Sequence, residues 1–181
     1  MTQALFLWRH PRAAGAEGRC IGRTDLPVGR RQAKRLARRI QQLARRHRLP
    51  KIVLTSPLRR GADVGRWLAR WGWTHRIDPA LAEVDFGCWD GLPWLSIPVA
   101  DLDAWCQDFM QFRPGGGESV AQLQTREAAW SPQDARVAVV HGGWLSAVLW
   151  RLEHGRADPA SRSWPAAPKH GSALVVPLPA D

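Results

Sequence analysis

Three short apolar runs divide the chain at wide intervals. They cover residues 5–8, 52–55 and 137–140. Each run is too short for a helix, and a continuous apolar run of this length is typical of a strand buried on both faces of a parallel sheet. Weaker patterns predict an edge strand at residues 74–77 and a last strand at residues 172–176.

Between these runs, apolar residues recur at helical spacing. The clearest case is residues 30–47, where Ala and Leu recur three and four positions apart and Arg or Lys fills the other face. Similar patterns predict further helices over residues 56–71, 99–112, 119–130 and 144–152. At the start of the second helix, Ser56 suits the N-cap and Pro57 suits the first helical position.

The order of these elements predicts the fold class. Strands that alternate with helices favour an α/β fold with a mostly parallel central sheet and helices on both faces, in three layers. The chain has 181 residues, which fits a single domain spanning residues 1–181.

Basic residues and imidazoles follow the predicted strands. Arg9 and His10 end the first run, His141 follows the third, and Arg59 and Arg60 begin the helix after the second. Taken singly, each could be an ordinary solvated loop residue. Parallel strands bring their carboxyl ends to one edge of the sheet, however, so we expect these side chains to surround a common ligand. Two arginines at a helix start oppose the helix dipole, which points to an anion.

The loop over residues 81–94 adds carboxylates to this edge. Glu83 is the candidate acid, and Asp85 is the alternative. An imidazole nucleophile, cations for the phosphoryl oxygens and an acid for the leaving oxygen are the groups that phosphoryl transfer needs. Histidines with metal-ligand spacing and closely spaced cysteines do not occur, so we expect no metal site. The G-x-S-x-G motif of serine hydrolases does not occur either.

Four sequence blocks resemble, in order, the motifs of the histidine phosphatase superfamily, which has the phosphoglycerate-mutase-like fold. The blocks are LWRH (7–10), SPLRR (56–60), EVDFGCWDG (83–91) and VVHGG (139–143). Two further segments, GRCIGRTDLP (18–27) and PGGGES (114–119), resemble the α-ribazole phosphatase branch, which acts late in cobalamin assembly.

The resemblance implies a phosphomonoesterase that forms a phosphohistidine on His10 and needs neither metal nor cofactor. Arg9, Arg60 and His141 would hold the phosphoryl oxygens, and Glu83 would protonate the leaving alkoxide and then activate water. Guanidinium groups suit this role because they can grip a phosphate with two parallel hydrogen bonds.

The same resemblance implies α-ribazole 5′-phosphate as the substrate. We expect four residues to contact it: Arg19, Arg23, Gly142 and Trp94. Trp94 and Trp89 could each stack on an aromatic base or simply pack in the core. The chain departs from the family where Pro11, Arg12 and Ala13 stand in place of the usual Gly, Glu and Thr.

Two alternatives within the family are a broad-specificity phosphatase and a phosphoglycerate mutase. Mutases carry extra segments that exclude water, and 181 residues leave little room for them. Composition adds an alternative from another class, because the net charge of +10 would suit a nucleic-acid-binding module built on the basic helix 30–47. That alternative does not explain why histidines and an arginine stand at the ends of the predicted strands. We therefore expect a small phosphorylated substrate and no nucleic acid.

The remaining features concern the cellular setting. No apolar run is long enough to span a membrane, and the start of the chain does not resemble a signal peptide. Cys20, Cys88 and Cys106 are scattered and odd in number, which suits a reducing compartment and predicts small buried side chains. We therefore expect a cytoplasmic protein; the sequence leaves its oligomeric state open.

Overall fold

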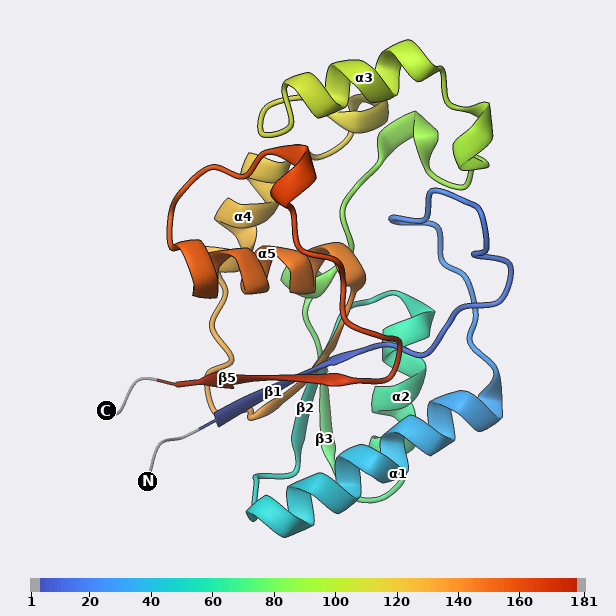
Figure 1. Cartoon of the computed structure of the whole chain (residues 1–181). Helices are drawn as coiled ribbons and strands as arrows, with labels where there is room; N and C mark the ends of the chain where they lie inside the picture. The colour runs from blue at the N-terminus through green and yellow to red at the C-terminus, as the bar shows by residue number, and fades with distance from the viewer. Residues whose placement is uncertain (1–3, 179–181) are drawn as a thin grey trace.

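The computed structural model describes residues 4–178, and a five-stranded sheet lies at its centre (Figure 1). The strands are β1 (Ala4–Arg9), β2 (Ile52–Thr55), β3 (Thr74–Ile77), β4 (Val137–Val140) and β5 (Ala173–Pro177). Their order is β3-β2-β4-β1-β5. Only β5, at one edge, runs antiparallel to its neighbour β1; the other pairs are parallel. The predicted α/β fold with a mostly parallel sheet is confirmed.

Helices cover both faces of this sheet (Figure 1). They are α1 (Arg30–His47) and α2 (Arg59–Ala69) on one face, and α4 (Val120–Ala129) and α5 (Gly142–His154) on the other, whereas α3 (Val99–Gln107) lies away from the sheet. Phe6 and Trp8 of β1 pack in the core under α1 and α2, whereas Leu5 and Leu7 pack in the core under α4 and α5. Because both faces are covered, every residue of β4 is buried, which explains why the strands read as continuous apolar runs.

The register of the strands aligns their carboxyl ends. Arg9 of β1 lies opposite Val140 of β4, so the residues that follow, His10 and His141, lie side by side. Their ring centroids are 4.8 Å apart. The sheet therefore brings together two histidines that are far apart in the sequence.

A third, smaller core lies beyond this edge of the sheet, on the side of α3 (Figure 1). It contains the buried Cys20, Trp89 and Ile97, with Trp105 packed against them. Trp89 is 5% exposed, so it is a core residue and has no free face for a base. The helix predicted over residues 99–112 ends at Gln107, because the chain turns there to build this core.

Three further details of the sequence analysis are wrong. The second helix begins at Arg59 with Leu58 as its N-cap, because the hydroxyl of Ser56 hydrogen-bonds His141 instead of capping the helix. The last long helix begins at Gly142, two positions before the predicted start at residue 144. Of the three cysteines only Cys20 is buried, while those at positions 88 and 106 are exposed.

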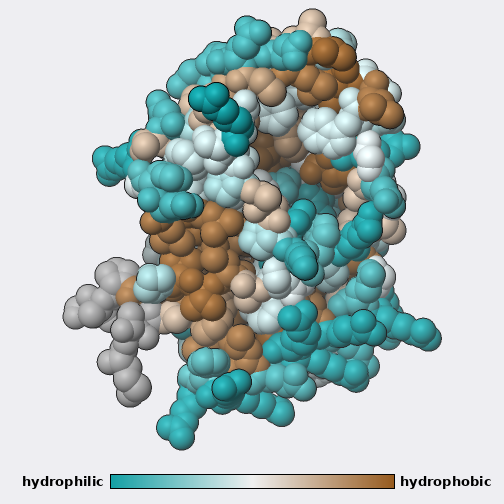
Figure 2. Space-filling view, viewed as in Figure 1, coloured by the Kyte–Doolittle hydropathy of each residue, from teal (hydrophilic) through white to brown (hydrophobic). Residues whose placement is uncertain are grey.

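The outer surface over α1 is strongly basic. Figure 2 shows hydrophilic residues along the lower edge of the molecule, where Figure 1 places α1. Its sequence contains no acidic residue, and its buried positions are all Ala, Leu or Ile. Among residues 4–178, no helix combines the length and the apolar character needed to cross a membrane.

Candidate active site

A pocket of about 210 Å³ opens at the carboxyl edge of the sheet. Its lining residues are Arg9, His10, Ala13, Ala16, Arg19, Ile21, Arg60, Glu83, Phe86, Trp94 and His170. Cations, imidazoles and one carboxylate thus share the pocket with small apolar and aromatic side chains. Four of the five residues predicted to be catalytic line it, and the fifth, His141, lies directly behind it.

His10 follows β1, and a hydrogen bond to the backbone of the next residue determines which ring nitrogen carries the proton. The Nδ1 atom lies 2.6 Å from the carbonyl oxygen of Pro11. A carbonyl oxygen only accepts hydrogen bonds, so Nδ1 carries the proton and Nε2 keeps its lone pair. Burial, and then the charge of Arg60, hold the pKa of His10 well below its usual value. His10 is therefore a neutral imidazole with a free nucleophilic nitrogen. The side chain is only 5% exposed, so it is not the surface residue that a strand end suggests.

His141 is fully buried and uses both ring nitrogens. Its Nδ1 accepts a hydrogen bond of 3.1 Å from Nε of Arg60. Its Nε2 therefore carries the proton and donates it to the hydroxyl of Ser56, 2.6 Å away. Burial holds the pKa of His141 well below the usual value. In this structure His141 packs against the His10 ring and orients Arg60.

Arg60 begins α2 and is 1% exposed. Besides the bond to His141, its two terminal nitrogens donate to the carbonyl oxygens of Gly22 and Thr24. Each terminal nitrogen keeps a second N–H, and the side chain lines the pocket, so Arg60 can still donate to an anion. Arg59 is exposed, and its backbone N–H donates to Asp25, so it lies outside the pocket.

The segment over residues 18–27 holds Arg60 in place. Asp90 accepts hydrogen bonds from the backbone N–H groups of Gly22, Arg23 and Thr24, and from the hydroxyl of Thr24. This turn presents to Arg60 the two carbonyl oxygens that it binds. One motif of the α-ribazole phosphatase resemblance therefore holds the side chain of Arg60 in position.

Arg9 reaches the pocket from the end of β1. One terminal nitrogen donates to the carbonyl oxygen of Pro168 over 2.7 Å. Its Nε is buried and has no hydrogen-bond partner among the described residues. The side chain lines the pocket, and its terminal nitrogens carry further N–H groups that can donate to an anion there.

Glu83 lies at the N-terminus of α5. Its Oε2 accepts a 3.0 Å hydrogen bond from the N–H of Gly142, and its Oε1 accepts from the N–H groups of Gly143 and Val84. Burial raises the pKa of Glu83, although these N–H groups and the nearby Arg60 oppose that shift. Because two donors occupy Oε1, only Oε2 has a lone pair left for a proton. Glu83 can therefore hold and release a proton at Oε2.

Asp85, the alternative acid, does not line the pocket. Its carboxylate accepts a hydrogen bond of 2.9 Å from the backbone N–H of Gly87 and so shapes its own loop. The geometry favours Glu83.

The four residues predicted to contact substrate divide into two pairs. Arg19 and Trp94 line the pocket. Arg23 is exposed outside it, and the N–H of Gly142 is bonded to Glu83 rather than directed at a ligand. A substrate role for Arg19 and Trp94 stays a prediction that the geometry permits.

The second motif of the α-ribazole phosphatase resemblance lies outside the pocket. The segment over residues 114–119 packs backbone to backbone against the loop that carries Glu83. A Cβ atom added to Gly115 would lie 2.2 Å from the carbonyl oxygen of Phe86, and one added to Gly117 would lie 2.1 Å from that of Asp85. This segment therefore supports the Glu83 loop and does not contact a ligand in the pocket.

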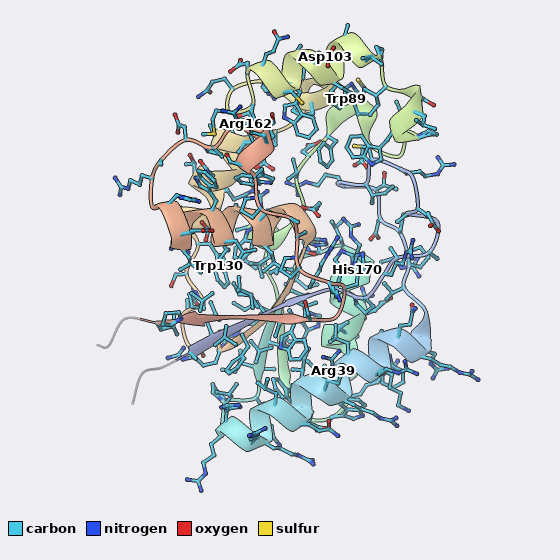
Figure 3. The ribbon with its side chains drawn as sticks, viewed as in Figure 1. Arg39, Trp89, Asp103, Trp130, Arg162 and His170 are labelled. Carbon is cyan, nitrogen blue, oxygen red and sulfur yellow. The ribbon has the colours of Figure 1, made fainter. Side chains whose placement is uncertain are left out.

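Sequence reasoning missed His170, which lies in the loop before β5 (Figure 3). Its Nδ1 is 3.2 Å from the backbone carbonyl oxygen of His10, and the two rings are 5.3 Å apart. The antiparallel direction of β5 explains its position, because the residues before β5 then lie beside the carboxyl end of β1. An apolar run alone does not reveal strand direction, so only an assumed antiparallel last strand would have found His170.

Possible metal ligands do not cluster in the part of the chain that the structure describes. Among residues 4–178, no group of three or more His, Cys, Asp and Glu side chains could hold a metal ion. Metal independence stays a prediction.

Comparisons with known proteins show the family of the chain. A sequence model of the histidine phosphatase superfamily (branch 1) matches residues 5–174. None of the curated proteins matches the chain in sequence. Among solved structures, a mycobacterial glucosyl-3-phosphoglycerate phosphatase in complex with VO3 is similar. Its TM-score is 0.73 and its identity 26%, over 96% of this chain and 90% of that chain.

Two further structures are equally similar. Mycobacterial hydrolase 1 has a TM-score of 0.74 and 26% identity, over 97% of this chain and 91% of its own. The protein TTHB049 from Thermus thermophilus has a TM-score of 0.70 and 28% identity, over 96% of this chain and 93% of its own. The family match spans most of the chain and covers every catalytic candidate. The protein therefore belongs to branch 1 of the histidine phosphatase superfamily and is a phosphatase.

Proposed function

We propose that the protein is a phosphomonoesterase that works through a phosphohistidine on His10 and needs no metal. The observation that carries this proposal is the free Nε2 of a neutral His10 in a pocket shared with two arginines and a buried acid. A neutral imidazole is the nucleophilic form, and cations around it offset the charge of the phosphoryl oxygens.

In the first step, Nε2 of His10 attacks phosphorus and the bond from phosphorus to the alcohol oxygen breaks. Arg9 and Arg60 hold the phosphoryl oxygens, while His141 keeps Arg60 oriented through Nδ1. The proton on Oε2 of Glu83 passes to the departing oxygen, so the product leaves as a neutral alcohol.

In the second step, Glu83 is a carboxylate and acts as a base. It takes a proton from a water molecule as the water oxygen attacks phosphorus. The bond between phosphorus and Nε2 then breaks, inorganic phosphate leaves, and His10 recovers its lone pair. Glu83 ends protonated, so both residues return to their starting states.

For the substrate, we propose a phosphomonoester whose alcohol carries a flat ring, with α-ribazole 5′-phosphate as the best candidate. The alcohol would lie against Trp94, which lines the pocket and packs edge-on against Phe86, 6.0 Å between ring centroids. An exposed face of Trp can stack on an aromatic base, worth about 1–3 kcal/mol. The 18–27 segment supports this candidate through Arg19, whereas the 114–119 segment gives no support because it packs against the Glu83 loop and does not line the pocket.

A second candidate is a phosphorylated glycerate derivative. The similarity to a mycobacterial glucosyl-3-phosphoglycerate phosphatase favours it. Arg19 lines the pocket beside the apolar wall and offers a cation for a carboxylate.

A panel of phosphate esters separates these candidates. We expect kcat/KM to be highest for α-ribazole 5′-phosphate, lower for other nucleoside monophosphates and lowest for small sugar phosphates, with excess EDTA causing no loss. A preference for glucosyl-3-phosphoglycerate would favour the second candidate, and a flat profile would indicate a general phosphatase. Transfer of phosphate between positions of phosphoglycerate would indicate a mutase. Loss of activity on chelation, restored by zinc or magnesium, would overturn the metal-free mechanism.

A further inference from the structure

His170 is held firmly against the nucleophile by its own loop. The N–H of Gly171 donates to the carbonyl oxygen of Arg9 over 3.0 Å, and the side chain of Arg9 binds the carbonyl oxygen of Pro168. Arg39 of α1 adds a hydrogen bond of 2.8 Å to the carbonyl oxygen of Gly171. These bonds on both sides fix the position of the His170 ring in the lining of the pocket beside His10.

The hydrogen bond to His10 determines the tautomer of His170. The carbonyl oxygen of His10 accepts the bond, so Nδ1 of His170 is the donor. In the neutral ring Nε2 then carries a lone pair, on the side of the ring away from that carbonyl. Since the ring itself lines the pocket, Nε2 is the atom that can interact with a ligand.

His170 lies among the residues that would hold the phosphoryl group in the proposed mechanism. The charged and titratable groups around it are Arg9, Arg12, Arg60 and His10, with Glu83 in the same pocket. Partial burial and then the charge of Arg9 lower the pKa of His170, so the ring is neutral in the free enzyme near neutral pH. A phosphoryl dianion held by Arg9 and Arg60 would therefore meet a lone pair at Nε2, which repels it unless a proton lies between them.

We propose that His170 binds a phosphoryl oxygen through a protonated Nε2, so that each dianion entering the pocket brings one proton from solution onto His170. This inference rests on the proposed function, because it assumes that the phosphoryl group lies against His10. His170 would be a third cation around the phosphoryl group, present only while the site is occupied. The proton adds a charge-assisted hydrogen bond to those from the two arginines.

The proposal makes anion affinity depend on pH. Arginines keep the pKa of His170 low in the free enzyme, and a bound dianion raises it. Between the free and bound pKa values, binding takes up a proton, so affinity falls tenfold for each unit of rising pH. Without His170, that contribution to the slope disappears.

Sulfate is the probe, because it stays a dianion without a proton of its own at pH 6–9. Its affinity is measured as competitive inhibition of nitrophenyl phosphate hydrolysis at several pH values. Calorimetry in buffers of different ionisation enthalpy counts the protons taken up. His170→Asn keeps an N–H at the position of Nδ1, so it preserves the bond to His10 while removing Nε2. His154→Asn, which changes an exposed histidine at the end of α5, is the matched control.

We expect His170→Asn to take up one proton fewer per sulfate than the wild type and the His154→Asn control. His170→Gln, whose amide reaches the position of Nε2, should bind sulfate with the same reduced pH dependence as the Asn variant. Equal proton uptake in the wild type and His170→Asn would overturn the proposal and leave His170 a support for the His10 backbone. If sulfate fails to compete at all, the phosphoryl site itself, and with it the proposed function, is wrong.

Discussion

At the scale of single residues, the pocket contains an imidazole and a carboxyl group whose pKa values are shifted in opposite directions by their surroundings. Burial and Arg60 hold the pKa of His10 well below its usual value, which keeps the ring neutral. Burial raises the pKa of Glu83, which favours its protonated form. Both shifts favour the neutral form of the side chain, an imidazole with a lone pair and a carboxylic acid with a proton, which are the forms that a nucleophile and a general acid need.

These shifts predict the pH dependence of kcat/KM. In the proposed mechanism His10 attacks in its neutral form, so activity should fall as the pH drops through the lowered pKa of His10. In the same mechanism Glu83 donates in its protonated form, so activity should fall as the pH rises through the raised pKa of Glu83. We therefore expect a bell-shaped pH profile, in which the deprotonation of Glu83 causes the loss of activity on the alkaline side.

Replacing Glu83 tests this assignment. Glu83→Gln should remove the alkaline side of the profile and slow the hydrolysis of alkyl phosphates by about 10²–10⁴-fold, because the departing alkoxide loses its proton donor. The hydrolysis of nitrophenyl phosphate should slow least, since nitrophenolate leaves without a proton. Asp85→Asn is the matched control and should keep the profile of the wild type. Equal losses on alkyl and nitrophenyl phosphates would make Glu83 a structural residue.

The residue scale also shows where the sequence is informative. Arg9, His10, Arg60 and Glu83 are recognisable because each stands at a strand end, a helix start or a loop motif, and the structure brings them into one pocket. The support of Arg60 by carbonyl oxygens is not encoded in residue type, because any residue has a carbonyl group.

At the scale of elements, the main strands and helices follow from periodicity because burial on both faces leaves a clear apolar pattern. Element boundaries and strand directions were harder to predict. The start of α2 depends on a hydrogen bond between Ser56 and His141, which are 85 positions apart. The position of His170 depends on the direction of β5. Both depend on contacts distant in sequence, which local patterns do not contain.

The contact between two loops gives a prediction at this scale. Gly115 and Gly116 both have positive φ, 59° and 75°, so Ala is strained at either position. Only at Gly115 would the new Cβ meet backbone, whereas nothing lies within 4 Å at Gly116. Gly115→Ala should therefore lower the free energy of unfolding by about 1–3 kcal/mol more than Gly116→Ala, the cost of overpacking.

Urea unfolding measures this difference, and kcat shows its effect on the site. Because the loop pressed by residue 115 carries Glu83, Gly115→Ala should also lower kcat more than the Gly116→Ala control. Equal stability of the two variants would contradict the close backbone contact.

At the scale of the whole molecule, the net charge of +10 is concentrated on α1, away from the pocket. The exposed Arg31, Arg35 and Arg38 lie on this helix and do not line the pocket. Since salt screens exposed charges beyond about 8 Å at physiological ionic strength, changing all three to Gln should leave kcat/KM for nitrophenyl phosphate within about twofold. Arg19→Gln, inside the pocket, should lower it more.

The same variants test the nucleic-acid alternative. A nucleic-acid-binding module would bind DNA or RNA tightly and with strong salt dependence, and the triple α1 variant would weaken that binding. We expect no such binding to the wild type at physiological salt. Tight binding that is lost in the α1 variant would give the basic helix a function of its own.

The most direct test of the proposed mechanism is the identity of the phosphorylated residue. The enzyme is mixed with ³²P-labelled substrate, quenched within milliseconds and mapped by peptide analysis. We predict label on His10 that is lost in acid and stable in alkali, as expected for a phosphoramidate, and that is missing from a folded, inactive His10→Ala variant. Acid-stable label, label on another residue, or full activity of His10→Ala would contradict the mechanism.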